Sequence, residues 1–148
     1  MKGYLGAGIL FIAAACAVAQ PHEVNSFDAQ ALATVAKHQL EQMRLPPDQR
    51  VCLSLPNHRD PDRSLLNRIN GHDLRLRFGS ACWRNPNGFL LLVNKYQQTD
   101  RGSIEIKLEI DDMNLGGAHV VTRLREVDYK LRGEGELWKI KSSKAKNF

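Results

Sequence analysis

Ser-Ile-Glu-Ile-Lys-Leu-Glu-Ile-Asp, residues 103–111, is the stretch that decides the fold of this chain. Its apolar residues alternate with polar ones at every step; they are Ile104, Ile106, Leu108 and Ile110. A period of two residues is typical of a β-strand with one buried and one solvated face. Such a strand needs neighbours, so the stretch predicts a sheet with a core on one side.

Three neighbouring segments supply the other strands. The apolar run Phe89–Val93 precedes the stretch across a Thr-Asp-Arg-Gly turn, and the strand-like runs Ala118–Arg132 and Leu137–Ser142 follow it. Strands that follow one another across short turns pair as an antiparallel meander. We therefore expect the C-terminal half of the chain to form an antiparallel sheet.

The composition favours one globular domain. The chain has 148 residues, of which 43% are hydrophobic and 25% charged, enough for one core and too few for two. Its formal net charge is +5, but the 21 basic residues are scattered among 16 acidic ones. A solvated surface of mixed charge is therefore preferred over a basic patch for an anionic partner.

The first nineteen residues have the features of a signal peptide. Lys2 supplies a basic start, Leu5–Val18 is apolar, and Ala17-Val18-Ala19 matches the small-x-small site that signal peptidase cleaves. No other apolar run approaches the ~20 residues of a membrane-spanning helix. We expect residues 1–19 to be removed and residues 20–148 to form a single α+β domain, secreted or periplasmic, without an integral membrane segment.

Removal of the signal peptide leaves two of the three cysteines, Cys52 and Cys82. An even pair in an oxidising compartment is most simply a disulfide, and the chain has no C-x-x-C redox motif. Two isolated cysteines without paired histidines also make a poor zinc site. We therefore predict a Cys52–Cys82 disulfide. Lipidation of Cys16 is a minor alternative, because Ala13 stands where a lipid-attachment motif has a large aliphatic residue.

An amphipathic helix is predicted after a short polar lead. Asn25 and Ser26 offer N-caps, and Asp28 stands in the expected first turn. Apolar residues then recur at helical spacing; they are Ala29, Leu32, Val35, Ala36, Leu40 and Met43. Pro46 and Pro47 cannot continue the hydrogen-bond ladder, so the helix ends before them. We expect its apolar stripe to pack across the sheet rather than to bind a partner.

Shorter elements are predicted between the helix and the meander. Residues 51–55 alternate like a short strand, and residues 60–71 contain a short helix that starts after Asp-Pro-Asp and ends at Gly71. Residues 74–78 alternate again, with their two arginines turned outward. Residues 80–88 are predicted to be a loop with an Asn-Pro-Asn-Gly turn.

Two further details of the meander follow from its residue pattern. Phe89–Val93 is apolar at every position, which is typical of a central strand covered on both faces. The apolar register of the next long run slips near Arg125 and Glu126, and such a slip indicates a β-bulge that curves the sheet. After the last strand, the basic tail Lys141–Phe148 is expected to leave the domain.

The order of elements carries a resemblance to a known family. A long N-terminal helix and a short helical segment precede a curved meander that ends in Gly-Glu-Gly-Glu-Leu-Trp-Lys-Ile, residues 133–140. This order resembles the nuclear transport factor 2-like superfamily, which implies a cystatin-like cone of helix and curved antiparallel sheet. Asp60-Pro61 with Leu65-Leu66, and then Ser80-Ala81-Cys82, look like uncharacterised secreted bacterial members. The resemblance covers most of Ser26–Ile140 and implies no established active site, because many unrelated functions share the fold.

Candidate site residues follow from the register of the strands. Some members of the superfamily are isomerases or dehydratases that use an acid, a tyrosine or a histidine inside the cone. Three strand acids fall in the outward register and are poor candidates; they are Glu105, Glu109 and Asp111. Asp112 shares the inward phase, where Tyr96 or Tyr129 would approach it, and a carboxylate there could be a general base. A turn-forming role for Asp112 is the preferred alternative.

The sequence lacks the short motifs of other common active sites. The sequence has no G-x-S-x-G, no H-E-x-x-H and no Gly-rich phosphate loop. Its five histidines are too far apart to predict a metal site, and we predict no cofactor. Four arginines are expected to face solvent and could form a basic patch; they are Arg75, Arg77, Arg123 and Arg125. No aromatic residues interleave them, so we predict no nucleic-acid partner. The Gln-x-Val-x-Gly hairpin of cystatin-type protease inhibitors is also absent.

Three functions stay open. The preferred one is an exported, non-catalytic binding or interaction module that holds an unknown small molecule or protein in its concave sheet, where Asp112, Tyr96 and Tyr129 rim an apolar surface. The second is a small lyase or isomerase with an acid and tyrosine site in the cone. The third is a basic surface module that binds anionic envelope components, or a protease-inhibitor-like protein. A homodimer is left open.

We expect the exported protein to begin at Gln20, because the predicted cleavage follows Ala19. The intact mass of the periplasmic or culture-fluid form measures this directly. A form that still carries Met1, or a lipid on Cys16, contradicts the prediction.

Overall fold

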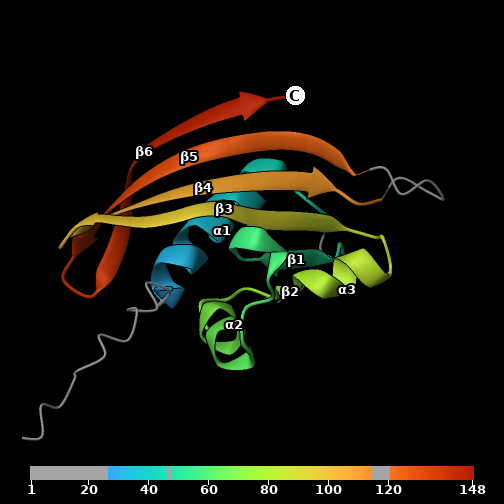
Figure 1. Cartoon of the computed structure of the whole chain (residues 1–148), viewed down its shortest axis with the longest axis horizontal. Coiled ribbons are helices and arrows are strands. Elements are labelled where there is room, and N and C mark those ends of the chain that lie inside the picture. Colours follow the sequence, from blue (N-terminus) through green and yellow to red (C-terminus); the bar gives the residue numbers. More distant parts are fainter. Residues whose placement is uncertain (1–26, 47, 115–120) are drawn as a thin grey trace, which may run out of the picture.

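The computed structural model describes residues 27–46, 48–114 and 121–148, so the predicted signal peptide and the N-caps Asn25 and Ser26 lie outside the described residues. The described chain forms one sheet of six strands in the order β2-β1-β3-β4-β5-β6 (Figure 1). The helices are α1 (Ala29–Met43), the short 3₁₀-helix η1 (Pro56–His58), α2 (Arg63–Asn70) and α3 (Gly79–Arg84). The strands are β1 (Val51–Ser54), β2 (Arg77–Phe78), β3 (Phe89–Asp100), β4 (Ser103–Asp112), β5 (Thr122–Glu134) and β6 (Leu137–Asn147).

Four strands of the sheet form the predicted meander. β3, β4, β5 and β6 pair in sequence order, each antiparallel to the next. β1 departs from this pattern, because it runs parallel to both β2 and β3. Parallel neighbours need a crossover connection, and α2, β2 and α3 lie within the connection from β1 to β3. The α+β class is therefore confirmed, with a sheet that is mostly rather than entirely antiparallel.

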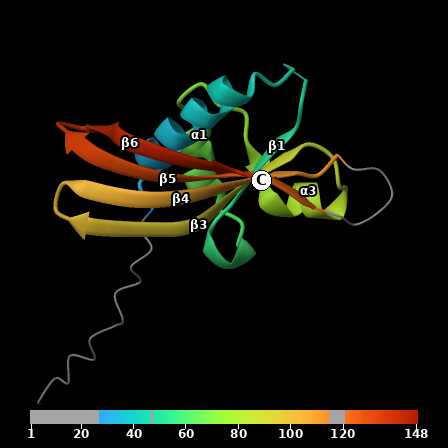
Figure 2. The ribbon, with the colours of Figure 1, turned by 90° about the horizontal axis from the view of Figure 1, so that it is seen from above.

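The inner face of the sheet packs against α1. Figure 2 shows this helix on one side of the strands of the meander. The apolar residues of β4 are at most 2% exposed there; they are Ile104, Ile106, Leu108 and Ile110. The stripe of α1 belongs to the same core, with Leu32 and Val35 each 1% exposed. The predicted packing of the helix across the sheet is confirmed.

The ends of α1 differ in detail from the prediction. Asp28 is the N-cap rather than a first-turn residue, and its carboxylate accepts a hydrogen bond from the Ala31 N–H at 2.9 Å. The helix ends at Met43, and Arg44 closes it in a left-handed conformation (φ 50°), so α1 stops before the two prolines. α1 has 15 residues, and no helix within the described ranges is long and apolar enough to cross a membrane.

A second, smaller core lies on the outer face of the sheet, beside α3. Its buried residues are Cys52, Cys82, Leu90, Leu92 and Met113. Leu91 and Val93 belong to the inner core, so alternate residues of β3 enter different cores and the strand is covered on both faces, as predicted. The prediction of a loop over residues 80–88 is wrong in its first half, which belongs to α3.

α3 begins directly against β1, and this contact requires a glycine. A Cβ atom on Gly79 would lie 1.8 Å from the Ser54 Oγ atom, so a side chain there would displace α3. The predicted disulfide is confirmed at the same corner, where Cys52 and Cys82 have Cα atoms 6.1 Å apart. It ties α3 to β1.

The segments before α3 follow the prediction in part. α2 begins after its N-cap Asp62, whose carboxylate accepts from the Leu65 N–H at 2.7 Å, and it ends before Gly71 as predicted. Residues 74–78 keep the expected alternation, with both leucines buried and both arginines exposed. Pairing with β1 is limited to Arg77–Phe78, so the strand is shorter than predicted.

The predicted bulge lies in β5, one residue before the expected position. Ile110 pairs with Arg125 and Asp111 pairs with Arg123, which leaves Leu124 as the extra residue. The bulge moves Arg125 opposite a residue of the inner face, where its side chain is half-buried and its Nε atom is buried. The prediction that Arg125 faces solvent is therefore wrong.

The predicted tail is part of the sheet. β6 continues along β5 as far as the pair of Arg125 with Asn147, so residues 141–148 do not leave the domain. These residues are all exposed. Backbone hydrogen bonds can extend a strand without burying its side chains. The polar composition of residues 141–148 therefore does not indicate where the sheet ends.

We predict that replacing Cys52 and Cys82 together by alanine lowers the free energy of unfolding by about 3 to 4 kcal/mol, the chain-entropy value for a loop of this size. The disulfide closes a loop with a sequence separation of 30 residues. Alanine is chosen because both cysteines are 0% exposed, and a serine would add a buried hydroxyl.

Denaturant unfolding with and without reductant measures this effect. Reductant should bring the native protein close to the stability of the alanine variant and leave the variant unchanged. Two titratable thiols per chain in the native protein without residues 1–19 would falsify the disulfide.

Candidate functional site

The structure places two of the three predicted binding residues on the same face of the sheet. Tyr96 on β3 and Tyr129 on β5 both pair with Ile106 of β4, so the two tyrosines share the inner face. Asp112 lies six residues further along β4, about 20 Å away at ~3.3 Å per residue. Its carboxylate accepts a hydrogen bond from the Asn114 N–H at 2.8 Å, which is the turn-forming contact of the preferred alternative.

Both tyrosine hydroxyls bind α1. The Asp28 N–H donates to the Tyr96 hydroxyl at 2.9 Å. The Gln39 Nε2 atom donates to the Tyr129 hydroxyl, which also lies 2.8 Å from the His38 Nδ1 atom. Tyr129 is 1% exposed, and burial raises its pKa to about 12, so the hydroxyl stays protonated at neutral pH. These tyrosines hold α1 against the sheet and already use their hydroxyls in doing so.

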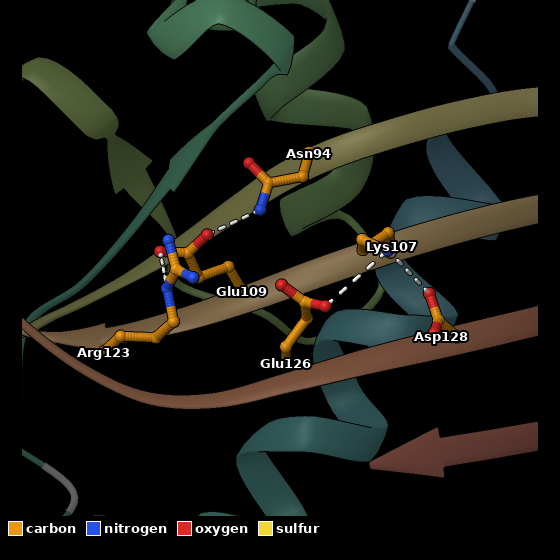
Figure 3. A network of polar contacts seen from close by, with 6 residues as sticks. All are labelled: Asn94, Lys107, Glu109, Arg123, Glu126 and Asp128. Carbon is orange, nitrogen blue, oxygen red and sulfur yellow. Dashed lines mark hydrogen bonds and ion pairs between the residues drawn. The ribbon is translucent and has the colours of Figure 1, made fainter. Parts of the chain in front are cut away.

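The charged residues of β4 before Asp112 lie on the outer face of the sheet. The Lys107 Nζ atom is 3.6 Å from the Glu126 Oε1 atom and 3.7 Å from the Asp128 Oδ1 atom, both on β5 (Figure 3). Lys95 on β3 likewise lies 3.4 Å from Glu105 on β4. These ion pairs form a row of charged side chains across three strands, in which Lys95 and Lys107 lie directly opposite each other.

A cavity of about 400 Å³ opens over this row, and we call it the outer-face hollow. Its charged walls are four lysines and two carboxylates; they are Lys95, Lys107, Lys130, Lys144, Glu105 and Asp128. Four positive and two negative side chains leave a formal charge of +2. The outer-face hollow is therefore suited to an acidic ligand.

Further along the outer face, Glu109 is held by two partners. The Arg123 Nε atom donates to its Oε1 atom at 2.7 Å, and the Asn94 Nδ2 atom donates to its Oε2 atom at 2.6 Å (Figure 3). Glu109 is 6% exposed. Burial raises its pKa, but the hydrogen bonds with Asn94, Arg123 and Asp111 and the charge of Arg123 together outweigh burial and leave the pKa below its ordinary value. Glu109 is thus a buried carboxylate that stays ionised.

Asp111 lies two residues from Glu109 on the same face and has a different charge state. It is 3% exposed between Leu90 and Arg123, and its Oδ1 atom has no hydrogen-bond partner within the described residues. Burial, with the hydrogen bond and charge of Glu109, raises the pKa of Asp111 to about 7. Asp111 can therefore take up or release a proton near neutral pH, whereas Glu109 stays ionised.

The alternation along β4 predicts the outer face for this carboxylate pair but not its burial. Glu109 and Asp111 fall on the side away from the isoleucines, which the pattern alone predicts to be solvated. The available signal was the neighbouring strand, because a β3 that is apolar at Leu90 and Leu92 implies a cover over its outer face. The residues that pair with these leucines on β4 are Asp111 and Glu109.

The part of the chain that the structure describes contains no candidate metal site. Residues 27–46, 48–114 and 121–148 hold no group of three or more His, Cys, Asp or Glu side chains that could bind a metal ion. His38 contacts the Tyr129 ring edge-on with centroids 5.5 Å apart, and His58 contacts Trp83 in the same way at 5.7 Å. Both imidazoles are therefore engaged with aromatic neighbours.

Comparisons of the chain with protein-family models, with curated proteins and with solved structures gave no match. The resemblance to the nuclear transport factor 2-like superfamily therefore stays a prediction from short motifs and element order.

We predict that Asp111→Asn stabilises the protein at pH 8 by about 1 to 3 kcal/mol and changes little at pH 4. The pKa of Asp111 is raised from 3.8 to about 7, so its ionisation costs stability as the pH rises between these two values. The asparagine amide resembles the neutral carboxyl group and removes that cost.

Urea unfolding at pH 4 and pH 8 measures the difference. Asp128→Asn is the matched control, because Asp128 lies on the same face with its side chain 57% exposed, and it should show no pH-dependent gain. An equal effect of Asp111→Asn at both pH values contradicts the assignment of a raised pKa.

Proposed function

We propose that this chain is an exported, non-catalytic interaction module with the cone fold of the nuclear transport factor 2-like superfamily, and that it binds an acidic partner in the outer-face hollow. The observation that carries the proposal is the lysine excess in this cavity of about 400 Å³. A carboxylate-rich protein segment or small molecule fits both its size and its charge.

The lysines of the outer-face hollow are available for a partner. Lys130 and Lys144 form no ion pair within the described residues. Lys95 and Lys107 have carboxylate partners, but at 3.4 to 3.7 Å and with half or more than a third of each lysine side chain exposed. Exposed pairs of this kind contribute at most about 1 kcal/mol each, so an incoming carboxylate can replace them.

The inner face supports a non-catalytic role. Its two tyrosine hydroxyls bind α1, and Asp112 lies at the far end of β4 in a turn. The acid and the tyrosines that a lyase or isomerase would use in the cone are therefore apart. This separation favours binding on the outer face over catalysis on the inner one.

One observation favours a small lyase or isomerase as the second candidate function. Asp111 has a pKa raised to about 7, which suits a general acid or base at neutral pH. Such an enzyme would use the outer face rather than the inside of the cone. Loss of turnover of a small substrate in Asp111→Asn, with the fold intact, would support this candidate over the binding module.

We predict that the double substitution Lys130→Gln and Lys144→Gln weakens binding of poly-glutamate about three- to tenfold, because it removes two charges from the outer-face hollow. Isothermal titration calorimetry at 50 mM and 200 mM salt measures the affinity, which should fall with added salt.

Lys139→Gln with Lys141→Gln is the matched control. It removes the same charge from β6, the strand that also carries Lys144, but both lysines are bound to Glu134, at 2.7 and 2.6 Å. This control should bind poly-glutamate nearly as the native protein does. An equal loss in both double variants would show that binding follows net charge alone and would reject the outer-face hollow as the site.

A further inference from the structure

A second charged cavity lies at the other end of the sheet, and we call it the arginine cavity. Its volume is about 480 Å³, and its lining residues are Asp48, Gln49, Arg50, Arg75, Arg77 and Asn87. Three guanidinium groups thus share one cavity with one carboxylate, which leaves a formal charge of +2. The four arginines that could have formed one basic patch do not share one surface, because Arg75 and Arg77 line this cavity whereas Arg123 binds Glu109.

The parallel pairing of β1 and β2 brings the three arginines together. Arg77 of β2 pairs with Cys52 of β1, and paired residues point to the same face of a sheet. Arg75 and Arg50 each lie two residues before a member of that pair, so alternation places them on the same face as well. The site is assembled from segments about 25 residues apart in the chain, and neither segment alone predicts it.

The backbone on the β2 side of the arginine cavity is fixed. Leu76, between the two arginines, donates its N–H to the Asn70 Oδ1 atom at 2.8 Å and accepts from the Asn70 Nδ2 atom at 2.9 Å. The Leu76 side chain is 4% exposed in the inner core. The Asn70 side chain, at the end of α2, thus makes the two backbone hydrogen bonds that a neighbouring strand would make to Leu76. These bonds fix the backbone between Arg75 and Arg77.

The β1 side is fixed as well. The Phe89 N–H donates to the Arg50 carbonyl at 2.9 Å. Gly88 lies so close that a Cβ atom on it would be 2.3 Å from the same carbonyl oxygen, and its φ of +97° also requires glycine. The three arginines thus extend from a rigid frame, which lowers the entropy cost of binding a ligand between them.

The guanidinium groups have few partners of their own. None of the three arginines forms an ion pair within the described residues. The Arg50 Nη1 atom makes one long hydrogen bond, to the Ala81 carbonyl at 3.5 Å. Three like charges around one cavity repel one another, and the attraction of each charge to an anion placed between them would offset that repulsion.

We propose that the arginine cavity binds a phosphate-type oxyanion, either free or as the headgroup of a phosphate-bearing molecule. Guanidinium groups present paired N–H donors that match two oxygens of a phosphate, and several of them can hold one tetrahedral anion. This site does not depend on the proposed function, because it lies at β1 and β2 whereas the outer-face hollow lies over β3 to β6.

Calorimetric titration of the full exported chain with inorganic phosphate at pH 8, at constant ionic strength, tests the proposal. We expect saturable binding with a Kd below about 1 mM and competition by sulfate. The double substitution Arg75→Gln and Arg77→Gln should weaken phosphate binding at least about tenfold, because both lost groups donate charge-assisted hydrogen bonds. Both arginines are exposed, and an unchanged melting temperature would show that the variant is folded.

Arg101→Gln with Arg132→Gln is the matched control, since both residues are exposed arginines elsewhere and neither lines the cavity. It should retain phosphate binding, as should the Lys130→Gln and Lys144→Gln variant. Absence of saturable binding, or an equal loss in the control, would overturn the proposal.

Vesicles of phosphatidylcholine, with and without one fifth phosphatidic acid, distinguish the source of the phosphate. Binding to the phosphatidic acid vesicles that is lost in Arg75→Gln with Arg77→Gln assigns a lipid headgroup to the site. Binding of inorganic phosphate without binding of these vesicles assigns a free phosphate compound.

Discussion

Burial of the β4 isoleucines and leucine under α1 is the constraint on which the rest of the structure depends. Each fully buried side chain of this kind contributes about 1.5 to 3 kcal/mol, whereas an exposed ion pair contributes at most about 1 kcal/mol. The apolar residues of β4 therefore determine which face of the strand packs against α1, and the charged residues that alternate with them lie on the opposite face. Polar groups that enter the inner core need partners, and the hydroxyls of Tyr96 and Tyr129 find them on α1.

Elements that are specified by residues close together in the chain could be predicted from the sequence. The period-two pattern of β4 and the bounds of α2, from Asp62 to Gly71, depend on residues close together in the chain. The disulfide followed from a simple count, because two cysteines lie outside the predicted signal peptide. The bulge in β5 was found within one residue for the same reason, because a change of phase is visible along one strand. These features supplied the α+β class and the order of the meander.

Features held by distant partners could not be predicted in this way. α3 has no side-chain cap at its N-terminus and is held by a disulfide and by the contact of Gly79 with β1. β6 is defined by backbone pairing with β5. The same limit applies to the candidate sites, because the burial of Asp111 depends on the cover beside β3, and the arginine cavity depends on a crossover that makes β1 and β2 parallel.

β6 is an edge strand, so its residues affect whether two copies of the molecule can associate through their sheets. The strand order ends with β6, so within the described residues its outward N–H and C=O groups have no partner strand. Lys144 and Lys146 occupy its exposed half, and two β6 strands pairing edge to edge would bring like charges together. The lysines thus oppose strand-mediated aggregation of identical chains, whereas an extended acidic segment would meet attraction along the same edge.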